Sequence, residues 1–229
     1  MKRLLLVCLA SAVLPACSSV SVKNLQAGGS RVAKPQRIYV APFSTEHTRI
    51  QAAGKQDPAR IAALKQSAST LLADYTVQNV SKHVAPASKV STAAGAPKSG
   101  WLVNGRISRL STGNRSMRVM VGLGVGATKM ETEVEVFDLA ASRRDPFLRF
   151  TTTGGSNAMP GLITSGGPGV AATYSMLAQA SSGVTDDAAR TSRMITGALS
   201  EYHVERGWLR KDKVFRTKKP GKYQLIHGM

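Results

Sequence analysis

Cysteine, aromatic and acidic residues are all scarce in this sequence of 229 residues. Two cysteines are too few for a disulfide scaffold, and 13 Asp+Glu against 31 Lys+Arg give a formal charge of +18. Only a single apolar run comes near the length of a membrane span, whereas a polytopic membrane protein needs several, so that class is excluded. Because 42% of the residues are hydrophobic, the length and composition fit one globular domain with loosely ordered ends.

The first sixteen residues, 1–16, have the pattern of a secretory signal. Lys2 and Arg3 precede an apolar run over residues 4–14 that only Ser11 interrupts. This run is about half of the roughly 20 residues that a membrane span requires. We therefore expect the segment to be removed rather than retained.

The residues Leu14-Pro15-Ala16-Cys17 resemble the bacterial lipobox. The resemblance implies that cleavage precedes Cys17 and that Cys17 carries a diacylglyceryl group and an N-acyl chain such as palmitate. The alternative is an ordinary secretory signal with a cysteine at its border. Ser18 stands where Asp would retain a lipoprotein at the inner membrane, so the resemblance favours the outer membrane, with the domain facing the periplasm.

The composition divides the remaining chain into three parts. We expect a tether over residues 17–36, a single domain over residues 37–209 and a basic tail over residues 210–229. Cys8 leaves with the signal and Cys17 is acylated, so the mature domain holds no free thiol. Its stability must therefore come from a packed core.

Two amphipathic helices and several strands are predicted for this domain. One helix extends from Asp57, its N-cap, to about Ser81, and a second extends from about Asp186 to Arg206, with Gly207 as its stop signal. The region 85–100 indicates a loop and 170–180 a short separate helix. Strands are predicted over residues 37–43, 101–110, 117–121, 130–138 and 147–153. The order predicts an α+β fold, a mainly antiparallel sheet with both helices on one face.

The alternation of polar and apolar residues that is typical of a strand is clearest over residues 130–138. Glu131, Glu133 and Glu135 project to one face of the strand, and Met130, Val134 and other apolar residues project to the opposite face. We expect the glutamates to lie on a solvated face. A carboxylate pair for catalysis is the less favoured alternative.

No cofactor, metal or catalytic residue is predicted with a complete motif. The glycines of residues 122–126 match neither a phosphate loop nor a dinucleotide fingerprint. The four histidines lack metal-ligand spacing and are expected at the surface or as caps. The alternative function is an envelope hydrolase or ligand-binding enzyme that uses the Gly154–Gly169 region, with Ser156 as nucleophile and His203 as base.

The basic tail is the strongest electrostatic feature of the sequence. Because a secreted protein meets little nucleic acid, we expect no nucleic-acid partner. The tail's cations are candidates for contact with anionic lipid, lipopolysaccharide or an acidic protein; the alternative is a solvated tail. These candidates are Arg210, Lys211, Lys213, Arg216, Lys218, Lys219 and Lys222.

The motifs together resemble a known family. Residues 37–43, 102–107 and 118–126, together with Val134–Asp138 and the helix end at residues 206–208, are similar to bacterial lipoproteins grouped as "domain of unknown function 4410". That family has no activity to carry across. The element order is also distantly similar to envelope assembly lipoproteins such as the curli secretion channel, which oligomerise. We therefore expect a non-enzymatic adaptor or assembly factor, with an envelope protein or a second copy as its partner.

Overall fold

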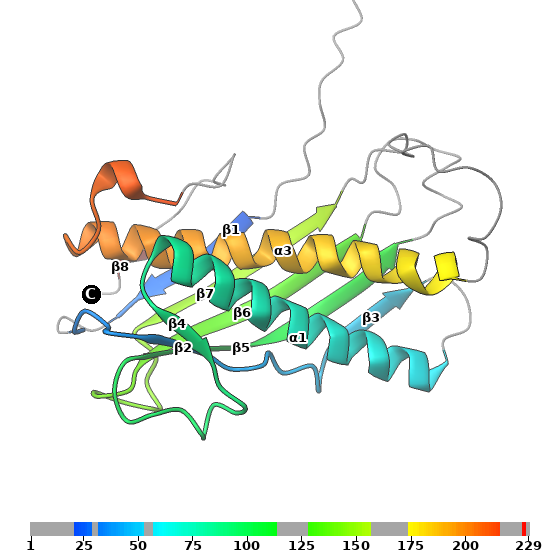
Figure 1. The fold of residues 1–229 in the computed structure, drawn as a ribbon, viewed down its shortest axis with the longest axis horizontal. Helices are drawn as coiled ribbons and strands as arrows, with labels where there is room; N and C mark the ends of the chain where they lie inside the picture. Colours follow the sequence, from blue (N-terminus) through cyan, green and yellow to red (C-terminus); the bar gives the residue numbers. More distant parts are fainter. Residues whose placement is uncertain are drawn as a thin grey trace, which may run out of the picture.

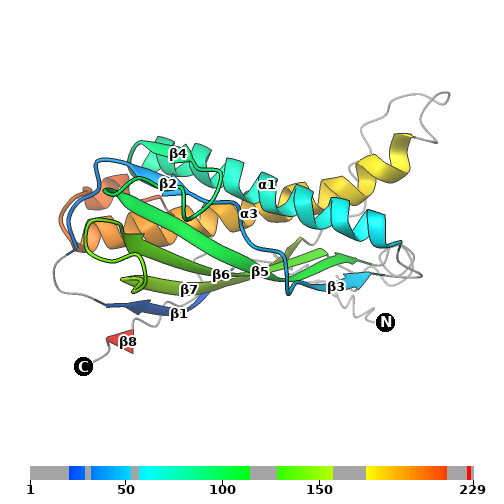
Figure 2. The same cartoon turned by 90° about the horizontal axis from the view of Figure 1, so that it is seen from below.

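One mixed β-sheet and two long helices make up the folded domain. The computed structural model describes residues 21–28, 32–52, 57–113, 128–156, 174–215 and 226–227. Both helices lie on the same face of the sheet (Figures 1 and 2), as the predicted α+β fold requires. The elements are β1 Ser21–Ala27, β2 Ile38–Val40, β3 Arg49–Ala52, α1 Pro58–His83, β4 Ala87–Lys89, β5 Trp101–Gly113, β6 Thr128–Asp138, β7 Leu148–Ser156, α3 Tyr174–Glu205, the 3₁₀ turn η1 Lys211–Lys213 and β8 Ile226–His227.

The strands follow the order β4-β2-β5-β6-β7-β1-β8, and β3 pairs with β5 beside β2. Antiparallel pairing joins β5 to β6, β6 to β7, and β7 to β1, whereas the other four pairs are parallel. The prediction of a mainly antiparallel sheet was therefore wrong. Helix α1 returns the chain to the end of the sheet from which β2 started, so β4 runs in the same direction as β2. Residues 90–100 return the chain a second time, so β5 is also parallel to β2.

Strand β1 lies inside the segment for which the composition predicts a tether. It pairs with β7, and its Val22 and Leu25 side chains are buried in the core. Beyond β1, Val32 is buried, and the Ala33 carbonyl accepts a hydrogen bond from Trp101 Nε1 at 3.0 Å. Residues 21–28 therefore begin the sheet, in contrast to the expected tether.

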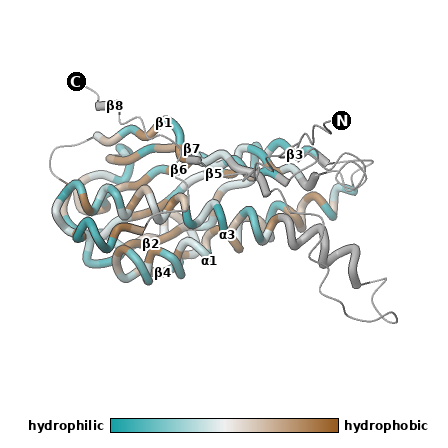
Figure 3. The backbone as a smooth tube through the Cα atoms, turned by 90° about the horizontal axis from the view of Figure 1, so that it is seen from above, coloured by the Kyte–Doolittle hydropathy of each residue, from teal (hydrophilic) through white to brown (hydrophobic). Residues whose placement is uncertain are grey.

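Helix α1 begins as the sequence predicts. Asp57 Oδ1 accepts a hydrogen bond from the Ala59 N–H at 3.1 Å, and Pro58 occupies the first turn, where its missing N–H costs nothing. The buried face includes Ala68, Leu72 and Val80. Apolar and polar stretches alternate along both helices in Figure 3, as one-sided burial requires.

Helix α3 is a single helix where two were predicted. It runs from Tyr174 through Gly183 to Glu205. Gly207 follows as the stop signal, and its φ of +72° is the left-handed conformation that glycine adopts readily. The predicted stripe is confirmed, because Ile195, Leu199 and Tyr202 are buried. A glycine within a helical pattern weakens the sequence signal without ending the helix.

Aromatic rings gather at the end of the sheet where β5 begins. The Trp101 ring lies 4.6 Å from Phe147, 4.9 Å from His203 and 5.9 Å from Trp208 between centroids. Trp101 is fully buried and His203 nearly so. The expectation that the histidines lie at the surface or cap elements was therefore wrong for His203.

The neighbours of Gly105 on β5 leave no room for a side chain at this position. A Cβ at this position would lie 3.0 Å from the Phe43 ring and would collide with the Glu133 carbonyl. We expect Gly105→Ala to lower the free energy of unfolding by about 1–3 kcal/mol, because crowding in a packed core displaces its neighbours. Urea unfolding measures the change.

Gly197→Ala in α3 is the matched control. Its Cβ would lie 3.5 Å from the Phe215 carbonyl, an ordinary contact, and alanine favours a helix over glycine by about 0.5–1 kcal/mol. We expect this variant to be unchanged or more stable. A Gly105→Ala protein as stable as Gly197→Ala would contradict the close packing.

Candidate functional site

The face of the sheet opposite the helices carries most of its charged side chains. Along β6, Glu131, Glu133 and Glu135 are partly exposed, whereas Met130 and Val134 are buried beneath the helices. This confirms the alternation that the sequence predicts. We call the charged surface over β5, β6, β7 and β1 the open face.

Each glutamate of the open face forms an ion pair with an arginine directly across the sheet. Glu133 is 2.7 Å from Arg106 of β5, and Glu131 is 3.1 Å from Arg109 of the same strand. Glu135 pairs on the other side, at 3.0 Å from Arg149 of β7. Directly opposed charges of opposite sign stabilise strand pairing modestly.

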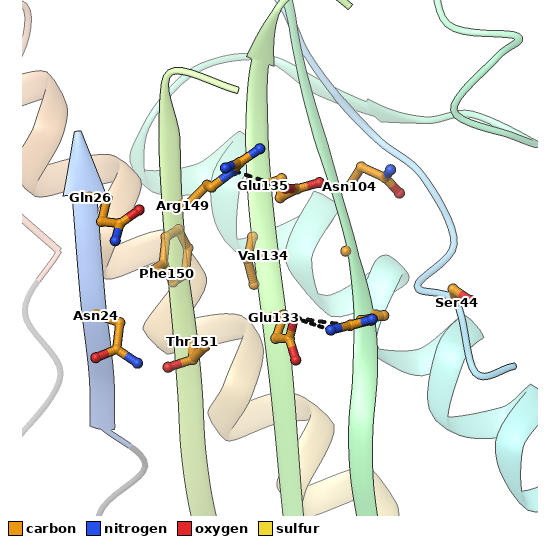
Figure 4. Close-up of a pocket in the computed structure, with 12 residues that line it drawn as sticks. Asn24, Gln26, Ser44, Asn104, Glu133, Val134, Glu135, Arg149, Phe150 and Thr151 are labelled. Atoms are coloured by element: carbon orange, nitrogen blue, oxygen red, sulfur yellow. Dashed lines mark hydrogen bonds and ion pairs between the residues drawn. The ribbon is translucent and has the colours of Figure 1, made fainter. Parts of the chain in front are cut away.

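A shallow depression of about 570 Å³ lies over this ladder of ion pairs (Figure 4). The side chains of Asn104, Glu133, Glu135 and Arg149 project from neighbouring strands into it, and Gln26 borders it from β1. A second depression of about 420 Å³ continues past Arg106 and is lined by His47, Arg49, Arg109 and Glu131, among others. The two share lining residues, so they form one groove.

The open face has an excess of positive charge. Arg49, Arg106 and Arg109 line the groove, as does Arg149, and Lys129 lies on β6 two residues before Glu131. With Lys23 of β1, exposed on the same face, these six cations against three glutamates leave a net charge of +3. Such a surface favours ligands that carry negative charge or accept hydrogen bonds.

A small second core closes one end of the open face. Leu102 of β5 and Phe137 of β6 point away from the helices and pack against Ala41, Ala96 and Leu139. The loop that supplies Ala96 is held by Arg143, whose Nη2 donates to the Ala96 and Pro97 carbonyls at 2.6 and 2.7 Å. The loop therefore limits the groove to the part of the sheet beyond Asn104.

The structure separates the residues of the hydrolase alternative. Ser156 pairs with Thr128 at one end of β6, whereas His203 packs on Trp101, which pairs with Asp138 at the other end. The 11 residues of β6 span about 33 Å. A Ser156–His203 dyad is therefore excluded, and residues 157–169 of that region lie outside the described residues.

Some of the other predicted site residues lie among the described residues, and others lie outside them. Cys17, the glycines of 122–126 and the tail cations Arg216, Lys218, Lys219 and Lys222 lie outside the described residues. Arg210, Lys211 and Lys213 are exposed, and Arg210 forms an ion pair with Asp212 at 3.0 Å. Phe215 follows them and stacks on His83, with 4.2 Å between ring centroids.

Two further features are absent from the described residues. No group of three or more His, Cys, Asp or Glu side chains there could hold a metal ion. None of the helices in that part of the chain has the length and hydropathy needed to cross a membrane.

The comparisons with known proteins identify a family. The sequence matches the family described as "Domain of unknown function (DUF4410)" over residues 38–173, more than half of the chain. The chain belongs to this family. Among the curated proteins there is no match. The DUF4410 match includes the strands β5, β6 and β7 that carry the ion pairs of the open face.

Two solved structures are remotely similar to this DUF4410 protein. The PelC dodecamer from Paraburkholderia phytofirmans has a TM-score of 0.34 at 12% identity, covering 75% of this chain and 96% of that chain. A neuraminyllactose-binding hemagglutinin homolog from Helicobacter pylori has a TM-score of 0.34 at 9% identity, covering 78% and 93%. Similarity this low carries no argument about function.

Substitutions on the two faces of β6 are expected to differ in how much they change the stability of the fold. Thr132 Oγ1 lies 2.6 Å from Thr152 Oγ1 beneath the helices, and both side chains are buried. We expect Thr132→Val to cost about 1–3 kcal/mol, because it leaves the Thr152 hydroxyl buried without this partner. Glu133→Gln, one residue further, removes an exposed ion pair and should change stability by less than about 1 kcal/mol.

Urea unfolding of both variants measures the difference. The double variant Thr132→Val/Thr152→Val is the control, since it removes both hydroxyls and should recover much of the loss. A larger effect at Glu133 than at Thr132 would contradict the assignment of buried and open faces.

Acidification is expected to destabilise the fold through His203. Its Nδ1 lies 2.8 Å from the Leu199 carbonyl, and burial lowers the pKa of His203 below the usual value of 6.5. The unfolded chain therefore takes up a proton that the folded chain does not. The contribution of His203 is complete above about pH 6.5 and is lost as the pH falls below that value.

Unfolding measured from pH 7.5 to 5 tests this expectation. His203→Gln should flatten the dependence of stability on pH, and His47→Gln, at an exposed position, controls for the loss of a histidine. Equal slopes for His203→Gln and the parent chain would refute a role for His203.

Proposed function

We propose that this protein is a non-enzymatic, lipid-anchored component of the bacterial envelope that presents the open face of its sheet to a partner. One observation carries the proposal. A charged start, a short apolar run and Cys17 follow one another at the N-terminus, and the first strand begins at Ser21, four residues later. An anchor is thus joined directly to a folded domain.

The chemistry of the open face supports an adaptor or assembly factor. Its carboxylates are held by arginines, and the amides of Gln26 and Asn104 lie beside them. Such side chains recognise a polar surface through hydrogen bonds and charge complementarity. An envelope protein or a second copy of the chain would find matching donors and acceptors there.

The compartment that we propose is the periplasmic face of the outer membrane. Ser18, in place of an inner-membrane retention residue, supports the outer membrane. Cys8 and Cys17 are the two cysteines of the chain, so a processed and acylated protein has no thiol exposed to an oxidising environment.

Substitution of either cysteine tests the anchor. We expect the full chain, expressed in a bacterial host with a lipoprotein pathway, to yield a mature protein that starts at an acylated Cys17. Cys17→Ser should lose the lipid and the membrane association. Cys8→Ser is the matched control, because this cysteine is removed with the signal, and it should be processed normally. Mass spectrometry and membrane flotation measure both properties.

Two results would overturn the anchor. One is an unmodified Met1 on the purified protein, and the other is a mature N-terminus without lipid. The first would remove the envelope assignment, and the second would leave an exported protein with an ordinary secretory signal and no anchor.

A further inference from the structure

The first strand fixes where an anchor at Cys17 can meet the folded domain. Ser21 at the start of β1 pairs with Thr153 of β7, in the row of the sheet that continues through Glu131 and Arg109 to Arg49. Cys17 and Ser21 are four residues apart, which limits the separation of their Cα atoms to about 14 Å. A lipid on Cys17 therefore holds the Ser21 end of this row close to the bilayer surface.

Exposed cations surround the same end of the sheet. Lys23 lies two residues beyond Ser21, Arg49 ends the row on β3, and Lys129 lies beyond the row on β6. Arg60 is in the first turn of α1, which begins beside the tip of β3 (Figures 1 and 2). We call Lys23, Arg49, Arg60 and Lys129 the anchor-side cations.

The described part of the basic tail lies at the other end of the molecule. Arg210 and Lys211 follow Trp208, which packs on Trp101 at the start of β5. The Phe215 N–H donates to Ser200 Oγ at 2.8 Å and so holds this segment against α3. Trp101 and Arg109, the residue of the row on β5, are eight residues apart, which corresponds to about 26 Å. Residues 210–215 are thus far from the anchored row.

We propose that the anchor-side cations form a surface that binds the anionic headgroups of the membrane in which Cys17 is anchored, so that the domain stands with the start of β5 directed away from the bilayer. The proposal rests on the lipid anchor of the proposed function. The proposed contact surface therefore lies at the end of the sheet opposite residues 210–213, whose cations were the candidates from the sequence.

Charge and spacing both fit this orientation. The row from β1 to β3 crosses four strand spacings, about 19 Å, so the cations extend from the anchored strand across the width of the sheet to β3. Within the row, Glu131 is partly exposed and is paired with Arg109. The fully exposed acids nearby are Glu46 in the turn before β3 and Asp57, whose side chain caps α1. Each cation near an anionic surface strengthens binding about fivefold.

Quenching of a label by nitroxide on lipid headgroups tests the orientation. Because the mature chain has no thiol besides Cys17, a cysteine placed by Gln51→Cys on β3 or by Ser99→Cys before β5 labels one end alone. The acylated protein is reconstituted on vesicles containing phosphatidylglycerol. We expect the label at 51 to be quenched at least threefold more than the label at 99.

The charges are tested by two matched variants. One replaces the anchor-side cations Lys23, Arg49, Arg60 and Lys129 with Gln. The other replaces four exposed cations of the opposite end, Lys82, Lys98, Arg144 and Lys211, with Gln. We expect the first variant to lose most of the preference for quenching at 51 and the second to keep it. Vesicles of phosphatidylcholine alone should also reduce the preference.

The outcomes separate this inference from the anchor itself. Vesicle flotation reports the anchor, and a protein that does not float refutes the proposed function. A protein that floats but is quenched equally at 51 and 99, or more at 99, overturns the orientation alone. An unchanged preference in the anchor-side variant overturns the assignment of the charges.

Discussion

The covering of one face of the sheet by both helices is the constraint on which the rest of the structure depends. It forces each central strand to alternate, with Met130 and Val134 under the helices and Glu131 and Glu133 on the open face. Among the described residues no second layer covers the open face, so its side chains must be compatible with water. The arginines of β5 and β7 meet this need, because each neutralises a glutamate of β6 without burying charge. The charged open face is thus a consequence of the fold's asymmetry.

The aromatic cluster around Trp101 holds together distant parts of the chain. Trp101 donates to the Ala33 carbonyl, and the Ala33 N–H donates to the Asp138 carboxylate at 3.3 Å. The same ring contacts His203 and Trp208 at the end of α3. The N-terminal segment, the β5–β6 hairpin and the last helix therefore meet at one end of the sheet. Since β1 also pairs with β7, the N-terminal segment is fixed at both ends of its folded part.

The sequence predicted the elements with strong local signals and missed those that depend on the tertiary structure. Asp57-Pro58 and the glutamates of β6 are local patterns, and both predictions were confirmed. In β1 the alternation is interrupted at Asn24, where a φ of +52° and a register shift disturb period two. Strands β3 and β4 have four and three residues, too few to show an alternation of polar and apolar residues. The arginine partners of the glutamates follow from strand register, which no single strand contains.

The distribution of positive charge acquires meaning only when the fold is known. Along the sequence, the cations of the tail form a run and dominate the electrostatic reading, whereas Lys23, Arg49, Arg60 and Lys129 are isolated. The fold places these four at the end of the sheet where β1 starts, to which an anchor would be attached, and it places residues 210–213 at the far end. Because β1 is hydrogen-bonded within the sheet and only three residues separate Cys17 from it, an acyl chain would constrain the orientation of the domain as well as its location. A short link to a rigid strand converts attachment into orientation, whereas a long tether would leave the domain free to rotate.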